Sequence, residues 1–273
     1  MSEPLKPTEP LAEALKAGGF DVFTPMSASW YNDYLRRSSL ATDEDHVGGK
    51  AFSLSLLPDY GRGGDTLALL IGNSRAMWPS FLSWLRDQPD DVANPVDTFT
   101  SQVIGRAVSE FAGSVKHDIF WASDFSPERL VDMNRASLVS GLCYFSEEMF
   151  LSIHPTFGSW VAFRAVVVLD MPASHLGEPP AHLPPLLSGE EETAARAAFA
   201  EAMEASSKVE LTCDGMPPEI AHKWAAMRDC VGLGREHKYS ALQSEYHYTK
   251  DRSLLRRAMD EEGGDGVVAA APS

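Results

Sequence analysis

The sequence predicts an α+β fold in which a mixed or antiparallel sheet is flanked by helices. Two nearly continuous apolar runs, at residues 66–71 and 160–169, are rich in leucine and valine and are typical of strands buried on both faces. A shorter apolar run at residues 117–121 predicts another strand. Helical segments alternate only loosely with these runs, and the chain contains no internal repeat, which favours an α+β domain.

The composition is that of an ordinary globular protein. With 273 residues, 44% of them apolar and 23% charged, the chain can bury a large core as one domain, or as one domain with an extension. Its formal net charge of −16 argues against nucleic acid or an anionic membrane as the main partner. No apolar run approaches the roughly 18 residues that a membrane span needs. The N-terminal segment lacks the apolar core of a secretory signal.

The cysteines indicate a reducing compartment. Cys143, Cys213 and Cys230 are odd in number and far apart, and no CxxC pair is present. Neither a disulfide framework nor a zinc knuckle is therefore expected. The histidines do not show a metal-binding spacing either, so we expect no protein-bound metal and a soluble, cytoplasmic protein.

In the first half of the chain, residues 1–17 are expected to form an arm with a short helix at residues 11–16. Residues 43–64 predict a surface loop with a short strand at 52–56. After the strand at residues 66–71, a helix with Met77 on its apolar face is expected. Asn94-Pro95 predicts the capped start of another helix, whose apolar face has four members. These are Val96, Phe99, Val103 and Ile104.

In the second half, Ser126-Pro127-Glu128 predicts the start of a long helix reaching Phe145. The strand at residues 160–169 follows, and the prolines of residues 170–188 predict an extended connector within the domain. Residues 190–205 have strong helix propensity. We assign the main domain to residues 18–258 and expect residues 259–273 to form a disordered acidic tail.

Arg164 is the residue that fits least well in its predicted surroundings. It lies within the apolar run of residues 160–169, and a guanidinium stays charged at any working pH. Its burial costs several kcal/mol unless an anion meets it. The partner is either a structural carboxylate or an anionic ligand. From the residues alone, this is the sharpest indication of function in the chain.

Further arginines stand out from the acidic background. Arg228 lies in the segment KWAAMRDC, and others lie at residues 252–257. Two or three of them, together with Arg164, would suit a small dicarboxylate or a phosphate, because guanidinium forks bind these anions bidentately. The alternative, favoured on these residues alone, is that Arg228 pairs with an acid such as Asp229 and that the C-terminal arginines are solvated.

Two other features have plain structural interpretations that we favour on the residues alone. Trp30, Tyr31 and Tyr34 suit a pocket wall, but core packing explains them equally simply. His154, beside Pro155, is more typical of a hydrogen-bonded turn residue than of a base or a metal ligand. No nucleotide-binding or nucleophile-elbow motif is present.

Several blocks of sequence together carry a family resemblance. They are FDVFTPMSASWYNDYL, LALLIGNSRAM with a later NPVD, SIHPTFGSWVAFRAVVVL, MRDCV and KYSALQSEY. In this order they resemble the intracellular vitamin B12 processing proteins of the cblC type (methylmalonic aciduria and homocystinuria type C), across roughly residues 18–258. The third block is the most specific, because the family motif there is HPxFGGW followed by an arginine in an apolar strand.

The resemblance implies a flavin-reductase-like, nitroreductase-related α+β fold that binds cobalamin with its lower base displaced. It also implies an enzyme that removes the upper ligand, as a cobalamin dealkylase and cyanocobalamin reductase. Cyanide would leave reductively with electrons from a flavin, FMN or FAD, and alkyl groups would pass to glutathione as co-substrate. The implied partners are a downstream cobalamin-trafficking protein and a flavin reductase.

The resemblance also assigns site residues by position. The cobalamin contacts fall on the expected long helix, at its far end and on the strand that follows. They are Leu130, Val131, Asp132, Met133, Tyr144, Phe145, Ser146, Ser152 and Phe163. The glutathione-binding arginines fall on Arg164, Arg228 and Arg252, with Arg256 as an alternative to the last.

The sequence departs from the family pattern at several points. Ser159 replaces the second glycine of HPxFGGW, and Ser137 stands where the family often has a histidine. A loop implicated in ligand-linked dimerisation is shortened to Ser126-Pro127-Glu128, so a monomer and a ligand-linked dimer are both left open.

Three functions follow for testing. The first is a cobalamin-processing enzyme that uses flavin and glutathione. The second is a carrier that binds cobalamin and passes it on without turnover. The third is a flavin-dependent reductase that does not use cobalamin, which ranks last because no nicotinamide-binding fingerprint is visible.

Overall fold

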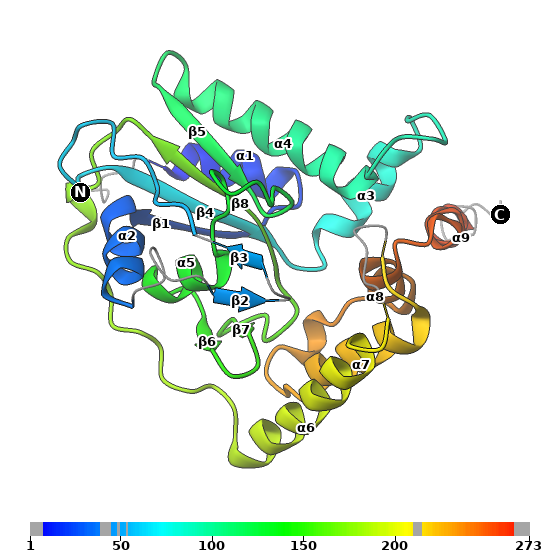
Figure 1. Ribbon diagram of the computed structural model, residues 1–273. Coiled ribbons are helices and arrows are strands. Elements are labelled where there is room, and N and C mark those ends of the chain that lie inside the picture. The colour runs from blue at the N-terminus through cyan, green and yellow to red at the C-terminus, as the bar shows by residue number, and fades with distance from the viewer. Residues whose placement is uncertain (1–7, 39–44, 48–49, 53, 210–214, 265–273) are drawn as a thin grey trace, which may run out of the picture.

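The computed structural model describes residues 8–38, 45–47, 50–52, 54–209 and 215–264. Its centre is a 4-stranded antiparallel sheet with the strand order β1-β4-β8-β5 (Figure 1). The strands are β1 (Val22–Ser27), β4 (Leu67–Asn73), β5 (His117–Trp121) and β8 (Ala162–Leu169). The antiparallel α+β arrangement that the sequence predicts is therefore confirmed.

The central strands β4 and β8 are buried on both faces of the sheet. Along β8, Ala165, Val167 and Leu169 face one apolar cluster, whereas Val166 and Val168 face another. Alternate residues of a strand point to opposite faces, so a strand covered on both sides needs an unbroken apolar run. The valine-rich run that predicts this strand has that property.

Helices cover each face of the sheet. One face packs against α1 (Glu9–Ala17), α3 (Met77–Leu85), α4 (Pro95–Ala112), α8 (Ala241–Thr249) and α9 (Arg252–Gly264). The opposite face packs against α2 (Ala28–Arg37) and α5 (Met133–Val139). Figure 1 shows α2 and α5 on the side of the sheet away from α1 and α4.

A smaller body forms a third apolar cluster. The hairpin of β6 (Tyr144–Ser146) and β7 (Leu151–Ile153) packs against α6 (Gly189–Ser206) and α7 (Pro218–Asp229). A capping box at Ser188 and Glu191 fixes the start of α6. The remaining elements are short. They are β2 (Asp45–Val47), β3 (Lys50–Phe52), and the 3₁₀ turns η1 (Ser174–Leu176) and η2 (Arg235–His237).

Two local predictions are wrong. The structure has no long helix from Ser126 to Phe145, because Ser126 donates to Asp124 in a tight turn instead of capping. The helix α5 begins only after Asp132, whose carboxylate accepts from the backbone of Asn134 and Arg135. Gly141, at φ 68°, then ends the segment.

The strand β1 is not predicted by the sequence. Its segment contains Pro25 and polar residues, which weaken a strand pattern, but β1 lies at the edge of the sheet, where a missing donor is tolerated. The short strand expected at residues 52–56 lies earlier, at β3. Asn94 does begin α4, although in the left-handed region and without a side-chain cap.

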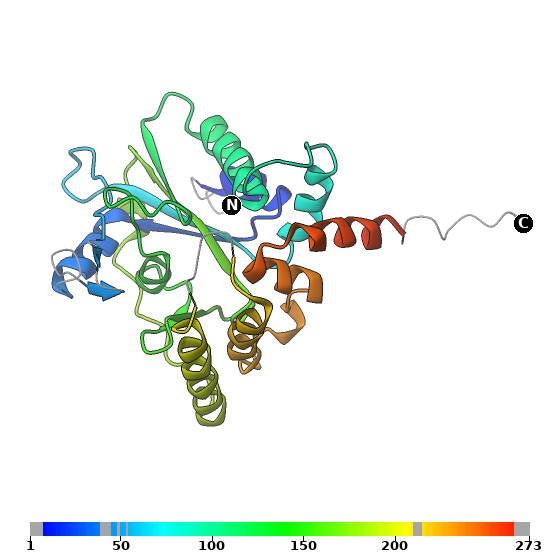
Figure 2. The ribbon, with the colours of Figure 1, turned by 45° about the vertical axis from the view of Figure 1, so that its right-hand side comes forward.

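The two ends of the described chain are more structured than expected. Leu11 and Leu15 of α1 are part of the main core, so this helix belongs to the packed body. The helix α9 extends to Gly264 and leads away from the sheet (Figure 2), so residues 259–264 are helical. The rest of the expected tail, residues 265–273, lies outside the described residues. Among the described helices, none is long and apolar enough to cross a membrane.

The turn that leads into β8 depends on close backbone packing. His154 Nδ1 accepts hydrogen bonds from the backbone of Thr156 at 3.0 Å and Phe157 at 3.2 Å, as expected for a structural turn histidine. Gly158 has φ 57°, and a Cβ there would overlap the carbonyl oxygen of Leu233. A side chain at this position is therefore excluded both by the backbone conformation and by contact with a neighbouring loop.

We predict that Gly158→Ala lowers the free energy of unfolding by about 2 kcal/mol or more, from left-handed strain together with overlap. The matched control is Gly105→Ala, in α4, where an added Cβ meets nothing within 4 Å. That variant is expected to gain about 1 kcal/mol from helix propensity. Urea unfolding of both variants measures the difference, and equal stability would contradict this account of the turn.

Candidate functional site

Arg164 lies near the start of β8, just before the strand enters the core. Residues 162–164 are partly exposed, whereas Ala165 and the residues after it are fully buried. The Nε of Arg164 donates to Asn73 Oδ1 at 2.6 Å. No ion pair joins Arg164 to a carboxylate of the described residues. Since desolvation lowers the pKa of this guanidinium, its charge is poorly compensated in the free protein.

A small cavity of about 20 Å³ lies beside Arg164, between β8 and α8. We call it the cationic pocket. Its lining consists of Met77, Trp78, Val96, Arg164, Tyr239, Gln243, Tyr246, His247 and Lys250. A larger cavity of about 380 Å³ shares Val96, Tyr246 and Lys250 with it and extends toward Arg252. Together they form a cleft from the end of the sheet to the start of α9.

Positive charge dominates the cationic pocket. Burial, reinforced by Arg228, Lys250 and Arg164, holds the pKa of His247 well below its ordinary value. Desolvation and the nearby Arg164 lower the pKa of Lys250, although its side chain keeps exposed surface. Asp97, at the rim of the larger cavity, opposes these effects only in part. An anion bound here would relieve the repulsion among these cations.

Arg228 is held by the backbone. It is buried, and its Nε donates to the carbonyl of Ser159 at 2.9 Å, while Nη2 donates to Ser159 and Val161. Its guanidinium lies 4.5 Å from the ring centroid of Trp160 and 5.0 Å from that of Tyr239. These contacts brace α7 against the turn before β8, so Arg228 has a structural role whether or not it binds a ligand.

Arg252 also has backbone partners. Its Nη1 donates to the carbonyl of Val92 at 2.9 Å, and its Nη2 donates to that of Asp90. Arg252 borders the larger cavity, while Arg256 is exposed one helical turn further along α9. The structure therefore places Arg164 in the lining of the cationic pocket, Arg228 outside it against the ring of Tyr239, and Arg252 at the far end of the cleft.

The predicted cobalamin contacts gather on the opposite face of the sheet. Ser152 Oγ donates to Asn134 Oδ1 at 2.8 Å and lies 3.2 Å from Ser137 Oγ, so β7 is tied to α5. Phe145 pairs with Ser152 across the hairpin. Phe163 packs against the apolar cluster that contains Val131 and Met133.

Most of these predicted contacts are covered in this structure. Leu130, Tyr144 and Phe163 are partly exposed. The others are buried, namely Val131, Asp132, Met133, Phe145, Ser146 and Ser152. The ring of Phe150, 54% exposed and in the left-handed region at φ 49°, packs edge-on against Phe145 with centroids 5.3 Å apart. Phe150 therefore shields the hairpin from solvent.

Two departures from the family pattern are accommodated. Ser159 Oγ donates to the carbonyl of Arg228 at 2.9 Å, so the hydroxyl that replaces a glycine makes a buried bond. Ser137 Oγ donates to the carbonyl of Asn134 at 2.7 Å, close to Ser152.

The cysteine thiols that the structure describes are poorly suited to act as nucleophiles. Burial raises the pKa of Cys143 to about 12. Burial and Asp229 also raise the pKa of Cys230. A thiol is reactive as its thiolate, which these surroundings disfavour. Cys213 lies outside the described residues. Within the described part of the chain, no group of three His, Cys, Asp or Glu side chains could hold a metal ion.

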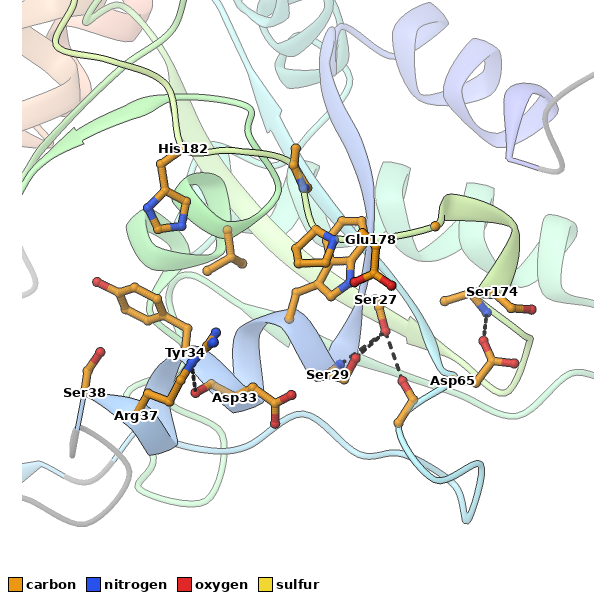
Figure 3. Close-up of a pocket in the computed structure, with 17 residues that line it drawn as sticks. Ser27, Ser29, Asp33, Tyr34, Arg37, Ser38, Asp65, Ser174, Glu178 and His182 are labelled. Carbon is orange, nitrogen blue, oxygen red and sulfur yellow. Dashed lines mark hydrogen bonds between the residues drawn. The ribbon is translucent and has the colours of Figure 1, made fainter.

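Another cavity, of about 920 Å³, lies between α2 and the proline-rich connector, and none of the predicted cobalamin or glutathione contacts lines it. Figure 3 shows Tyr34, Asp33 and Arg37 of α2 facing His182 and Glu178 of the connector. Trp30 and Tyr34 line this cavity, whereas Tyr31 is fully buried and its hydroxyl accepts from the backbone of Asp132. The aromatic segment is thus part pocket wall and part core.

Sequence reasoning did not find most of the cationic pocket. The sequence predicts no ligand-binding role for four of the pocket's residues, Tyr239, Gln243, His247 and Lys250. Their spacing of three or four residues places them on one face of a helix, a signal that was available in the segment KYSALQSEYHYTK. Only the fold shows that this face meets Arg164.

Comparison with solved structures defines the fold class. The chain matches the B12-trafficking protein CblC of C. elegans with a TM-score of 0.64 and 19% identity, over 92% of this chain and 94% of that chain. The epoxyqueuosine reductase of Bacillus subtilis is more distant, with a TM-score of 0.45 and 14% identity over 85% of this chain and 66% of that chain. The chain therefore has a CblC-like α+β fold.

Sequence comparison leads to the same group of proteins. The chain is 27% identical over 173 residues to the cyanocobalamin reductase / alkylcobalamin dealkylase of Danio rerio, covering 57% of this chain and 61% of that protein. It thus spans about three-fifths of the length of that relative. No family model matches the chain. The predicted resemblance to cblC-type proteins is confirmed in sequence and in fold.

The lowered pKa of His247 predicts a dependence of stability on pH. Below about pH 6.5 the unfolded chain binds a proton that His247 resists in the folded chain, so the free energy of unfolding falls as the pH falls. His247→Gln should flatten this decline between pH 7 and 5. Part of the decline should remain in that variant, because burial also lowers the pKa of His154. Urea unfolding across this range checks the slope. The exposed His222→Gln serves as control, and an unchanged slope in His247→Gln would contradict the prediction.

Proposed function

We propose that this protein binds cobalamin and removes its upper axial ligand, by reductive decyanation and by transfer of alkyl groups to glutathione. One observation carries the proposal. Phe163 and Arg164 are neighbours on β8, so the predicted cobalamin contacts and the cationic pocket meet at one end of the sheet. The name of the Danio rerio protein supports the same chemistry, and that of the C. elegans protein supports cobalamin as the ligand.

The cationic pocket supports glutathione as the co-substrate. Glutathione is a tripeptide with two carboxylates, and guanidinium and ammonium groups are their natural partners. Arg164 is best placed to bind one, because its Nη atoms make no hydrogen bond within the described structure. We propose that Arg228 acts mainly by orienting this site, and that Arg252 contacts the more distant end of the peptide.

Alkyl removal requires a thiolate at the alkyl carbon. As the sulfur–carbon bond forms, the cobalt–carbon bond breaks and its electron pair stays on cobalt. The protein's task is to hold the thiolate in line and to exclude water. Nearby positive charge lowers the pKa of a bound thiol and raises its thiolate fraction. The unfavourable surroundings of Cys143 and Cys230 support an external thiol.

We propose that the corrin binds against α5, the β6–β7 hairpin and Phe163. Leu130, Tyr144 and Phe163 are the predicted contacts with accessible surface. Movement of the Phe150 ring away from Phe145 would expose more apolar surface to the corrin. Cyanide removal additionally requires electrons, for which we propose a reduced flavin, FMN or FAD, supplied directly or by a partner reductase.

The proposal includes partners and a location. Free glutathione is abundant in the reducing cytoplasm, where we propose that the protein acts and hands processed cobalamin to a trafficking protein. A carrier without turnover is the second candidate, and the description of the C. elegans protein as a B12-trafficking protein favours it.

We predict that titration of methylcobalamin with this protein shifts its visible spectrum toward the base-off form, because the proposed site holds cobalamin with the lower base displaced. Adding glutathione should then produce the cob(I)alamin spectrum as the methyl group is transferred, because the electron pair of the broken bond stays on cobalt. Absorbance spectra under anaerobic conditions measure both steps.

The spectral outcomes separate the candidates. A shift without turnover would favour the carrier. No shift, with a yellow protein that oxidises NAD(P)H, would favour a flavin reductase that does not use cobalamin.

We predict that Arg164→Gln weakens glutathione-dependent dealkylation at least tenfold, because it removes the charge that meets a carboxylate. The amide of glutamine keeps a donor for Asn73, so folding should be retained. Arg62→Gln is the matched control, since Arg62 forms a surface ion pair with Asp170. Dealkylation rates at several glutathione concentrations measure the effect. Cobalamin binding should be unchanged in both variants. Normal dealkylation rates in Arg164→Gln would show that Arg164 does not bind glutathione.

A further inference from the structure

The hydroxyl of Tyr239 is buried, and within the described structure no acceptor takes its proton, while the guanidinium of Arg228 lies near enough to its oxygen to donate. Such groups are rare in folded proteins, because a buried hydroxyl that loses its bonds to water is destabilising. The position therefore calls for a physical explanation that packing alone does not provide.

The aromatic ring of Tyr239 does have a structural role. It packs against Trp160 with centroids 5.3 Å apart and against His247 at 5.9 Å, and the guanidinium of Arg228 lies 5.0 Å from its centroid. A phenylalanine ring could make each of these contacts. The oxygen atom is therefore the part that remains to be explained.

The charged groups around Tyr239 are hydrogen-bond donors. Tyr239 lines the cationic pocket together with Arg164 and Lys250, and it interacts electrostatically with both Arg164 and Arg228. Guanidinium and ammonium groups donate but do not accept. Gln243 and His247 also line the pocket and could accept, but neither does so in the described structure, and the O–H of Tyr239 is left without an acceptor in a site whose cations favour an anion.

We propose that the Tyr239 hydroxyl is a binding residue of the cationic pocket, donating a hydrogen bond to a carboxylate of the ligand that Arg164 binds. The carboxylate supplies the missing acceptor, and the arginine and the tyrosine then hold the same anion from different directions. Because it names glutathione as that ligand, this inference rests on the proposed function. With this neutral donor beside Arg164, binding depends on the position of the carboxylate as well as on its charge.

The proposal predicts that Tyr239→Phe changes the stability of the free protein and its affinity for glutathione in opposite directions. Tyr239→Phe removes an unsatisfied buried hydroxyl, so the free protein should keep or raise its Tm. The same variant should bind glutathione about tenfold more weakly, the loss expected for one hydrogen bond to a charged group.

The experiment uses the full chain without cobalamin. Isothermal titration calorimetry with glutathione, and separately with the simple dicarboxylate glutarate, gives Kd, and thermal unfolding gives Tm. Tyr60→Phe is the matched control, because the Tyr60 hydroxyl donates to Asp118 at 2.6 Å on the other side of the sheet. That control should lower Tm and leave both Kd values unchanged.

Each outcome decides a distinct point. Equal affinities of Tyr239→Phe and the unaltered chain for both anions would overturn the proposal and leave the glutathione site standing. A loss of folding or a clear fall in Tm in Tyr239→Phe would also overturn it, since the hydroxyl would then have a structural partner. If the unaltered chain bound neither anion, the cationic pocket and the proposal would both be wrong.

Binding of glutarate without glutathione would instead contradict the co-substrate in the proposed function. The effect of Tyr239→Phe on glutarate affinity would then still decide the role of the hydroxyl.

Discussion

The burial of β8 on both faces determines where this protein can place a charge. From Ala165 to Leu169 the strand is fully buried between two apolar clusters, and an unpaired guanidinium there would be strongly destabilising. Residues 162–164 are partly exposed and can carry polar groups. Arg164 occupies the last of these positions. The same packing that stabilises the sheet thus places the candidate site at its end.

The arginines predicted for one site have different physical roles. Arg228 and Arg252 have their donors directed at backbone carbonyls, and they fix α7 and α9 against neighbouring loops. Arg164 has a single side-chain partner, Asn73. A guanidinium that braces the fold is already oriented, so it can contribute a field to a ligand without further ordering. Arg164 retains the free donors that a direct contact needs.

The sequence predicts the fold where a pattern is local and fails where tertiary contacts decide. The strands β4, β5 and β8 follow from apolar runs, and α6 follows from helix propensity. The extent of α5 could not be predicted, because it depends on whether Ser126 caps a helix or closes a turn with Asp124. Arg164 is conspicuous in the sequence as a charge in an apolar strand. Tyr239 and Lys250 are not, since only the packing of α8 against the sheet brings them to Arg164.

Phe163 and Arg164 point to opposite faces of β8. This constrains how the predicted cobalamin contacts and the predicted glutathione-binding arginines can act together. A ligand held by Arg164 must reach around the strand end to meet a corrin that contacts Phe163. The thiol of glutathione is on its central residue, roughly half of the about 10 Å length of an extended tripeptide from either end. That reach is comparable with the spacing of about 4.8 Å between neighbouring strands, so the thiol can pass a single strand while a carboxylate stays in the cationic pocket. A thiol carried by Cys143 has no such freedom, because that side chain is fixed in the core. A mobile peptide thiol therefore suits this geometry better than the thiol of Cys143.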